Sequence, residues 1–251
     1  MNTTIRSAIK QALTAPGFLI GILGVVVVLV FSCIEGIVDV LRSEELLTYG
    51  WHGMQIISAI RSNAFLMTLP IWASLPYTSS FCDEIKSGFT KLYLHRTTTS
   101  RYLFSKIIAC ILSGGLVLIL GIFITYGLFA LVFMPMEAIK TAETQNFVTV
   151  IKFIPNIFFS GALWAVVGML FSSATGSKYI AYASPFITYY LLVIIHERYL
   201  TKLHIISPHN WILKSESLPL GNFGAVILIL EITAVLSALF WIVGERRLKR
   251  L

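Results

Sequence analysis

The sequence has few charged residues for its length. Asp, Glu, Lys and Arg make up 12% of the 251 residues, whereas hydrophobic residues make up 57% and the mean hydropathy is +0.83. Soluble domains carry about 25% charged residues, roughly twice this fraction. A water-soluble fold of this size cannot bury so much apolar surface, which excludes a soluble globular domain. We therefore expect an integral membrane protein, with lipid as the surrounding solvent.

Cysteine and histidine are also scarce, and neither forms a metal-binding pattern. The three cysteines lie far apart, which indicates neither a disulfide framework nor a metal site; they are Cys33, Cys82 and Cys110. His196 and Glu197 begin a zinc-peptidase pattern, but Leu200 stands where the second histidine is needed. No serine has a G-x-S-x-G context. The sequence predicts no metal site and no catalytic residues, so we expect a chain that is not an enzyme.

A nucleotide-binding loop is missing as well. Gly176, Ser177 and Lys178 resemble the end of a phosphate loop, but in that motif the lysine follows the glycine directly. The earlier glycine of the motif would fall at Phe171, so the pattern fails twice. We expect the chain to bind no cofactor of its own. If ATP drives its action, another subunit must bind the ATP and Mg²⁺.

Six long apolar runs are present instead. They cover residues 16–38, 64–81, 107–133, 153–172, 179–195 and 223–244. Each is near the ~20 residues that a helix needs to cross a ~30 Å hydrocarbon core. The runs are continuous rather than alternating, which favours helices over a barrel. We expect an all-α fold with six transmembrane helices, forming a single transmembrane domain over residues 1–251.

Residues 1–15 precede the first run and have a mixed character. Their apolar residues recur at helical spacing, at Ile5, Ile9, Ala12 and Leu13. This pattern predicts a short amphipathic helix on the inner membrane surface, and a frayed leader is the alternative. The first run is too long for a signal peptide and no small-residue cleavage site follows it. We expect it to remain as an uncleaved span.

The distribution of positive charge predicts the topology. With the N-terminus in the cytoplasm, twelve of the nineteen Lys and Arg residues fall on inner segments. The net charge of +7 is thus explained by topology rather than by nucleic-acid binding. We expect a multi-pass protein of the cell membrane, that of a bacterium, with both termini in the cytoplasm.

Glu231 is the one carboxylate placed well inside an apolar run, as the ninth residue of the last. Such a group indicates either a substrate path or a polar contact between helices, and we favour the contact between helices. An ion-coupled carrier or channel, the alternative class of function, typically needs several such groups.

The segment between the second and third runs carries the most informative pattern. Residues 81–106 read FCDEIKSGFTKLYLHRTTTSRYLFSK, too polar to lie in hydrocarbon. Phe81, Glu84 and Gly88 have the spacing F-x-x-E-x-x-x-G. We expect a short helix on the inner surface, with Glu84 and Gly88 on one face and the glycine allowing a partner to approach closely.

This pattern resembles the loop between the second and third spans of the permease subunits of type-2 ABC transporters. The resemblance extends to the amphipathic N-terminal segment, the six runs and the basic C-terminal tail. Two residues depart from the family pattern. Phe89 stands where the family has a small residue or threonine, and Thr98 stands where it has a proline. The matching residues are Phe81, Glu84, Gly88, Lys91, Leu94, Ser100, Arg101 and Lys106.

The resemblance implies a function that the residues alone do not give. It implies the transmembrane subunit of an ABC exporter, with a coupling helix over residues 81–91 that contacts a separate ATPase. The implied contact residues are Phe81, Glu84, Ile85, Gly88 and Lys91. Two ATPase subunits and a second permease subunit, identical or homologous, would complete the assembly. Compact permeases of this kind resemble exporters of amphipathic peptides, lantibiotics, toxins or drugs, and the 13% aromatic content suits an apolar or amphipathic cargo.

Overall fold

The computed structural model describes residues 2–42, 47–94, 97–137, 145–201, 207–213 and 221–250. The regular secondary structure in these ranges is all helical, without a β-strand. In chain order the helices are α1 (Asn2–Thr14), α2 (Pro16–Ser32), α3 (Ile34–Arg42), α4 (Trp51–Arg61), α5 (Asn63–Ser74), α6 (Ser80–Lys86), α7 (Phe89–Leu94), α8 (Thr99–Phe133), the 3-10 turn η1 (Met134–Met136), α9 (Gln145–Thr175), α10 (Lys178–Arg198), α11 (Pro208–Leu213) and α12 (Gly221–Leu248).

The helices fit a protein embedded in a membrane. In the described part of the chain, α8, α9, α10 and α12 are each long and apolar enough to cross a bilayer. Two further pairs pass the same test together but are bent, α1–α2 by 50° and α4–α5 by 70°. The structure therefore confirms an all-α fold with four candidate spans, or up to six if each bent pair is one span.

The two bends have identifiable local causes. Ala15 is extended (φ −64°, ψ 139°) because it precedes Pro16, whose ring fixes the first residue of α2 and disfavours a helical residue before it. Ser62 is also extended, and its Oγ accepts a hydrogen bond from the amide of Phe65 (3.2 Å), which starts α5 as a new helix.

The boundaries of the second predicted run are wrong. Residues 64–81 were expected to form one span, but α5 ends at Ser74, turns follow, and α6 begins at Ser80. The apolar part is completed on the N-terminal side by α4, which lies between the first two predicted runs. The break lies where Arg61 and Ser62 interrupt the apolar pattern.

Helix α9 forms the centre of the bundle, packed against α5, α8, α10 and α12. In its apolar window 72% of the residues are buried, against 17% in α12. Gly114 of α8 and Gly161 of α9 face each other, since a Cβ added at Gly161 would lie 2.7 Å from the carbonyl oxygen of Gly114. Glycines at this crossing let the two backbones approach closely.

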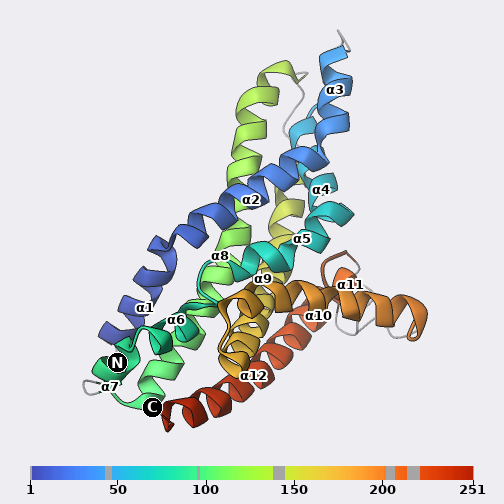
Figure 1. Cartoon of the computed structure of the whole chain (residues 1–251). Helices are drawn as coiled ribbons and strands as arrows, with labels where there is room; N and C mark the ends of the chain where they lie inside the picture. The colour runs from blue at the N-terminus through green and yellow to red at the C-terminus, as the bar shows by residue number, and fades with distance from the viewer. Residues whose placement is uncertain are drawn as a thin grey trace.

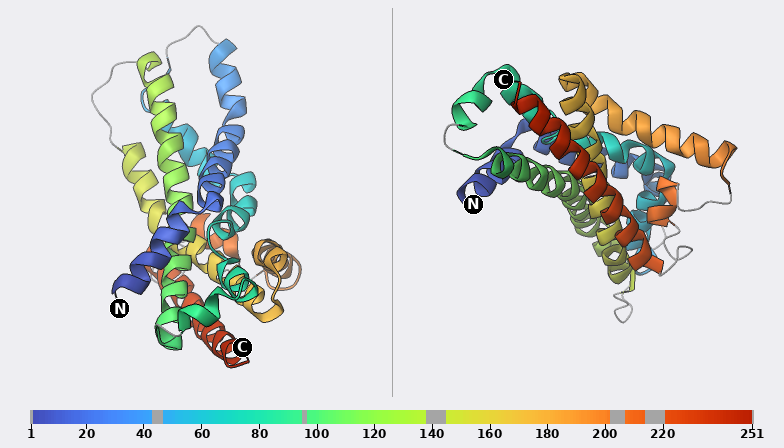
Figure 2. Two further views of the ribbon diagram at one scale, coloured as in Figure 1. Left: turned by 60° about the vertical axis from the view of Figure 1, so that its left-hand side comes forward. Right: turned by 90° about the horizontal axis from the view of Figure 1, so that it is seen from below.

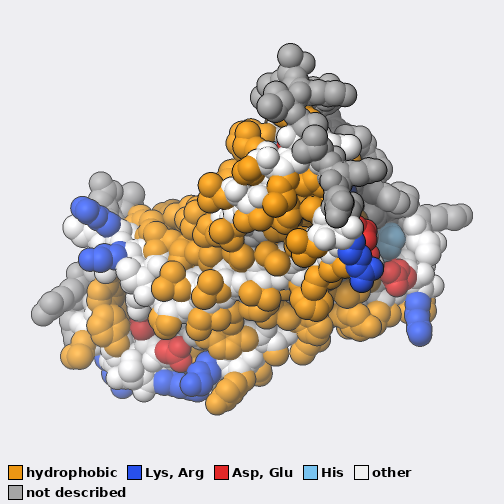
Figure 3. Space-filling model, turned by 90° about the horizontal axis from the view of Figure 1, so that it is seen from above, with side chains coloured by type: hydrophobic (Ala, Val, Ile, Leu, Met, Phe, Trp, Pro, Cys, Tyr) orange, Lys and Arg blue, Asp and Glu red, His pale blue; other side chains and the backbone are white. Residues whose placement is uncertain are grey.

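Both termini lie at the same end of the molecule as α6 and α7 (Figure 1), and α3 lies at the opposite end (Figure 2). Hydrophobic side chains cover the middle of the face in Figure 3, with Lys and Arg gathered near one end and a second charged group near the other. The first helix is formed as expected, with Ala8 and Ala12 buried, and it packs along α8. Its predicted position on the membrane surface remains a prediction.

Candidate functional site

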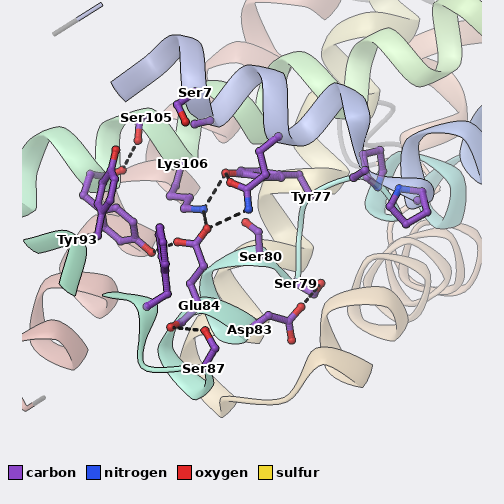
Figure 4. Close-up of a pocket in the computed structure, with 18 of the residues that line it drawn as sticks. Ser7, Tyr77, Ser79, Ser80, Asp83, Glu84, Ser87, Tyr93, Ser105 and Lys106 are labelled. Carbon is purple, nitrogen blue, oxygen red and sulfur yellow. Dashed lines mark hydrogen bonds and ion pairs between the residues drawn. The ribbon is translucent and has the colours of Figure 1, made fainter. Parts of the chain in front are cut away.

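A cavity of about 740 Å³ lies at the end of the molecule that holds both termini. Helix α1 forms one wall, and α6, α7 and the first turns of α8 form the others. The elbow between α1 and α2, the turns that follow α5, and Tyr182 of α10 complete the lining. The polar segment 81–106 therefore lines the cavity together with most of the helices that pack around this segment (Figure 4).

A buried ion pair stands in the wall of this cavity. Glu84 Oε1 of α6 and Lys106 Nζ of α8 lie 2.5 Å apart. The lysine is 2% exposed and the glutamate 9%. Burying either charge alone would be costly, so each side chain needs the other at this position.

Two tyrosines and a glutamine extend the pair into a network. Tyr102 donates a hydrogen bond to Glu84 Oε2 (2.7 Å), and Lys106 donates one to the hydroxyl of Tyr77 (2.7 Å). Gln11 of α1 closes the network by donating to Glu84 Oε1 (3.3 Å) and accepting from Tyr77 (3.1 Å). Figure 4 shows the Glu84 and Lys106 side chains pointing toward each other beside Tyr77. The network thus joins α1, α6, α8 and the turn after α5.

The tyrosine rings stabilise the lysine charge as well. Lys106 Nζ lies 4.6 Å from the ring centroid of Tyr77 and 5.5 Å from that of Tyr102, within the range of cation–π attraction. Burial, and after it the negative charge of Glu84, raise the pKa of Tyr77 above its ordinary range. Its phenol therefore stays protonated, as its hydrogen bond to Gln11 requires.

A second carboxylate, Asp83, lines the same cavity but faces a different set of groups. Its Oδ2 accepts a hydrogen bond from the hydroxyl of Ser79 (2.9 Å), and that hydroxyl accepts one from Tyr182 of α10 (3.0 Å). In the part of the chain that the structure describes, no lysine or arginine forms an ion pair with Asp83. Asp83 is also exposed, so its negative charge differs from that of the buried, ion-paired Glu84.

The structure divides the predicted contact residues into two groups. Phe81 is fully buried and Glu84 nearly so, and both contact helices of this chain rather than a free surface. Phe81 packs against Phe240 of α12, with ring centroids 5.3 Å apart. Within this chain these two residues anchor α6, and their contact with an ATPase stays a prediction. Ile85 is half-buried, and Lys91 is exposed on α7.

Gly88 forms a turn inside the predicted coupling helix. It has a φ of +73° and separates α6 from α7, so the predicted single helix over residues 81–91 is two short helices. A Cβ at this position would meet nothing within 4 Å. The left-handed backbone of the turn therefore favours glycine here, and the close approach of a partner at this position stays a prediction.

Several apolar and basic side chains of α6 and α7 are exposed. Phe89 is 48% exposed and Leu92 is 72% exposed. Lys86 and Lys91 are also exposed. We call these four residues the α6–α7 face.

Sequence reasoning missed the partners of Glu84. The sequence pattern includes Lys106 only as a match to the permease loop, and it does not single out Gln11, Tyr77 or Tyr102. One signal was available, since Glu84 and Lys106 are opposite charges on the two sides of one polar segment. Nothing in the spacing indicates that α1 supplies the remaining partner.

Glu231 lies apart from this site. It is on the exposed side of α12 and does not line the cavity. Both interpretations of this carboxylate, a polar contact between helices and a place on a substrate path, stay predictions.

A second polar cluster lies at the opposite end. Glu137 accepts hydrogen bonds from the amides of Gly50 (2.8 Å) and His52 (2.9 Å), and its Oε1 lies 2.7 Å from His52 Nδ1. Burial tends to raise the pKa of Glu137, but the hydrogen bonds from His52 and Gly50 outweigh it and leave the pKa below its usual value. The cluster fixes the start of α4 against the end of α8.

Comparison with known proteins adds no assignment. Among the described residues, no three His, Cys, Asp or Glu side chains are grouped closely enough to hold a metal ion. The chain matches no family model, and no curated protein shows significant similarity to it. The geometry of the cavity and of the α6–α7 face is therefore the basis for any functional proposal.

Proposed function

We propose that this chain is the transmembrane permease subunit of an ATP-driven ABC exporter. Helices α6 and α7 serve as the coupling element, and a separate ATPase subunit contacts the α6–α7 face. The cargo is an apolar or amphipathic molecule, such as a peptide, lantibiotic, toxin or drug. Two ATPases and a second permease subunit, identical or homologous, complete the assembly in the cell membrane, with both termini of this chain in the cytoplasm.

The observation that carries the proposal is the attachment of α6 to the rest of the bundle. A solvated loop would make few contacts, whereas α6 is held by the Glu84–Lys106 ion pair and by the buried ring of Phe81. Through these residues α6 contacts α1, α8 and α12. A partner that moves α6 therefore moves three other helices with it.

The α6–α7 face has the composition of a docking surface. Phe89 and Leu92 supply apolar area that a partner would bury, and Lys86 and Lys91 add positive charge to the exposed surface of the same two helices. A complementary partner groove would be apolar with acidic residues at its edge.

Co-purification with a charge substitution tests the proposal. The tagged chain is extracted from its native membranes, and the associated ATPase and its ATP hydrolysis are measured. We expect Leu92→Glu to lower the recovered ATPase about tenfold, because it places a carboxylate in the apolar centre of the contact.

Leu41→Glu is the matched control. Leu41 is 76% exposed, as Leu92 is 72% exposed, but it lies on α3 at the other end of the molecule. Its substitution should leave the recovered ATPase unchanged. Recovery of no ATPase with the unmodified chain, together with transport that stops when the proton gradient is abolished, would support an ion-coupled carrier instead.

A further inference from the structure

The cavity beside α1 changes in character from one part of its lining to another. The elbow of α1 and α2 and the end of α5 supply apolar groups: Ala15, Pro16, Gly17, Leu75 and Pro76. These groups adjoin the ends of the apolar helices α2 and α5. The lining from α6, α7 and α8 is rich in hydroxyl and charged groups instead. A ligand that matches both parts has an apolar portion and a polar head.

The charge of the lining favours a positive head. Three charged residues line the cavity, namely Asp83, Glu84 and Lys106, although the whole chain has a net charge of +7. Glu84 and Lys106 neutralise each other at 2.5 Å. Among the described residues, the side chain of Asp83 is bonded by a hydroxyl group and by no cation. One negative charge in the wall therefore has no positive partner there.

The position of Asp83 is fixed by contacts from a distant part of the chain. Its hydrogen-bond donor, Ser79, is itself held by the hydroxyl of Tyr182 from α10. Figure 4 shows Ser79 and Asp83 together, on a different side of the lining from Lys106 and Tyr93. The carboxylate is therefore oriented by its neighbours before a ligand binds.

Aromatic side chains elsewhere in the lining of the cavity suit an ammonium ion. The site already holds one ammonium, that of Lys106, between a carboxylate and the rings of Tyr77 and Tyr102. Phe89, Tyr93 and Tyr182 also line the cavity, and none of their rings contacts Lys106 as Tyr77 and Tyr102 do. A carboxylate together with aromatic faces is a recurring environment for organic ammonium groups.

We propose that this cavity binds the ammonium group of a cationic amphipathic molecule, with Asp83 as the counter-ion and the α1–α2 elbow against the apolar portion. The inference deepens the proposed function, because it assigns a charge to the cargo, and to that extent it rests on that function. The binding step itself requires no ATPase and can be measured on this chain alone.

The test uses the purified full-length chain in nanodiscs of phosphatidylglycerol, a lipid that has no ammonium group. Binding of octyltrimethylammonium is measured by calorimetry, with octyl sulfate and octyl glucoside as anionic and neutral probes of equal chain length. We expect saturable binding of the cationic probe only. Asp83→Asn should weaken it about tenfold, the effect of removing one charge partner near a protein surface.

Two variants keep the result interpretable. Asp83→Glu retains the charge and should retain most of the affinity. Asp39→Asn removes another exposed carboxylate, on α3 and outside the cavity, and should leave binding unchanged. Thermal unfolding of each variant checks that the fold is intact.

A second arm identifies the source of the ammonium group. Phosphatidylethanolamine is added to the nanodiscs, because its head carries a primary ammonium. Competition with the probe in the unmodified chain, but not in Asp83→Asn, assigns a lipid head group to the site. Absence of competition assigns a non-lipid amphipath, and either result supports an ammonium site.

Three results would overturn the inference. The first is equal affinity of the Asp83→Asn and unmodified chains for the cationic probe. The second is binding of the anionic or the neutral probe as tight as that of the cationic probe. The third is an effect of Asp83→Asn on ATPase recovery without an effect on probe binding. The last would place Asp83 in the contact with a partner protein. A chain that binds the probe through Asp83 but recovers no ATPase would retain the ammonium site and contradict the exporter.

Discussion

The ring of Phe81 on α6 lies edge-on against the ring of Phe240 on α12, with centroids 5.3 Å apart and an interplanar angle of 76°. Both side chains are fully buried. Phe81, although it belongs to a short polar segment, is thus part of the same hydrophobic core as Phe240 of the last helix.

This contact distinguishes two phenylalanines of the same segment. Phe81→Ala should lower the free energy of unfolding by about 3–5 kcal/mol, because it leaves a cavity between α6 and α12. Phe89→Ala, at a half-exposed position on α7, should lower it by less than about 1 kcal/mol. Chemical unfolding in detergent, followed by tryptophan fluorescence, measures both. Equal losses would show that Phe89 is also part of the core.

The Glu84–Lys106 pair predicts a non-additive result. Glu84→Gln or Lys106→Met alone leaves a buried charge without its partner and should cost about 3–5 kcal/mol of stability. The double variant removes both charges and should recover most of that loss. Unfolding of the four chains gives the coupling energy directly. Additive losses would mean that the two charges do not interact in the folded protein.

The turn at Gly88 predicts that a substitution there lowers stability through backbone strain and not through a steric clash. Gly88→Ala must place a Cβ on a backbone with φ +73°, at a cost of about 1–2 kcal/mol. Gly127→Ala is the matched control, since Gly127 is a helical glycine of α8 where a Cβ would also meet nothing within 4 Å. It should leave stability unchanged or raise it by up to ~1 kcal/mol. The same loss at both positions would contradict the assigned role of the turn.

Glu137 predicts a dependence of stability on pH. Its pKa is lowered in the folded chain, so folding favours the carboxylate over the protonated form. The stabilisation is complete above the pKa of the unfolded chain and is lost as the pH falls through the lower pKa of the folded chain. We expect the midpoint temperature of thermal unfolding to decrease as the pH is lowered from about 5 to about 3.

The control for this prediction is Glu137→Gln, which cannot titrate. It should be less stable than the unmodified chain at pH 7, and the difference between the two should narrow as the pH is lowered. A difference that stays constant from pH 7 to pH 3 would show that the charge of Glu137 does not stabilise the fold.

The fold class could be predicted from the sequence because apolar length is a local property. Runs such as 107–133 and 223–244 lie within α8 and α12, and Pro16 begins α2. The bend at Ser62 could not be located in the same way. The apolar pattern around it is interrupted by Arg61 and Ser62, and an interruption of this kind looks the same in a bent helix as in a connection between helices.

The candidate site was only partly predictable for a related reason. The F-x-x-E-x-x-x-G spacing located the segment, but spacing gives no direction for Glu84. Its direction depends on Gln11 and Lys106, which reach it from α1 and α8. Contacts of this kind exist only once distant helices are packed. The pattern includes Gly88, but its positive φ is a property of the backbone that the pattern does not contain.

Arg247 near the end of α12 donates a hydrogen bond from Nη2 to the carbonyl oxygen of Ala174 (3.0 Å), in the last turn of α9 and next to the left-handed Gly176. The two residues are 73 positions apart in the chain. During synthesis, the final turn of α9 therefore lacks this partner until the whole of α10 and nearly all of α12 have been made. The contact ties the end of α9 to a residue that is translated well after it.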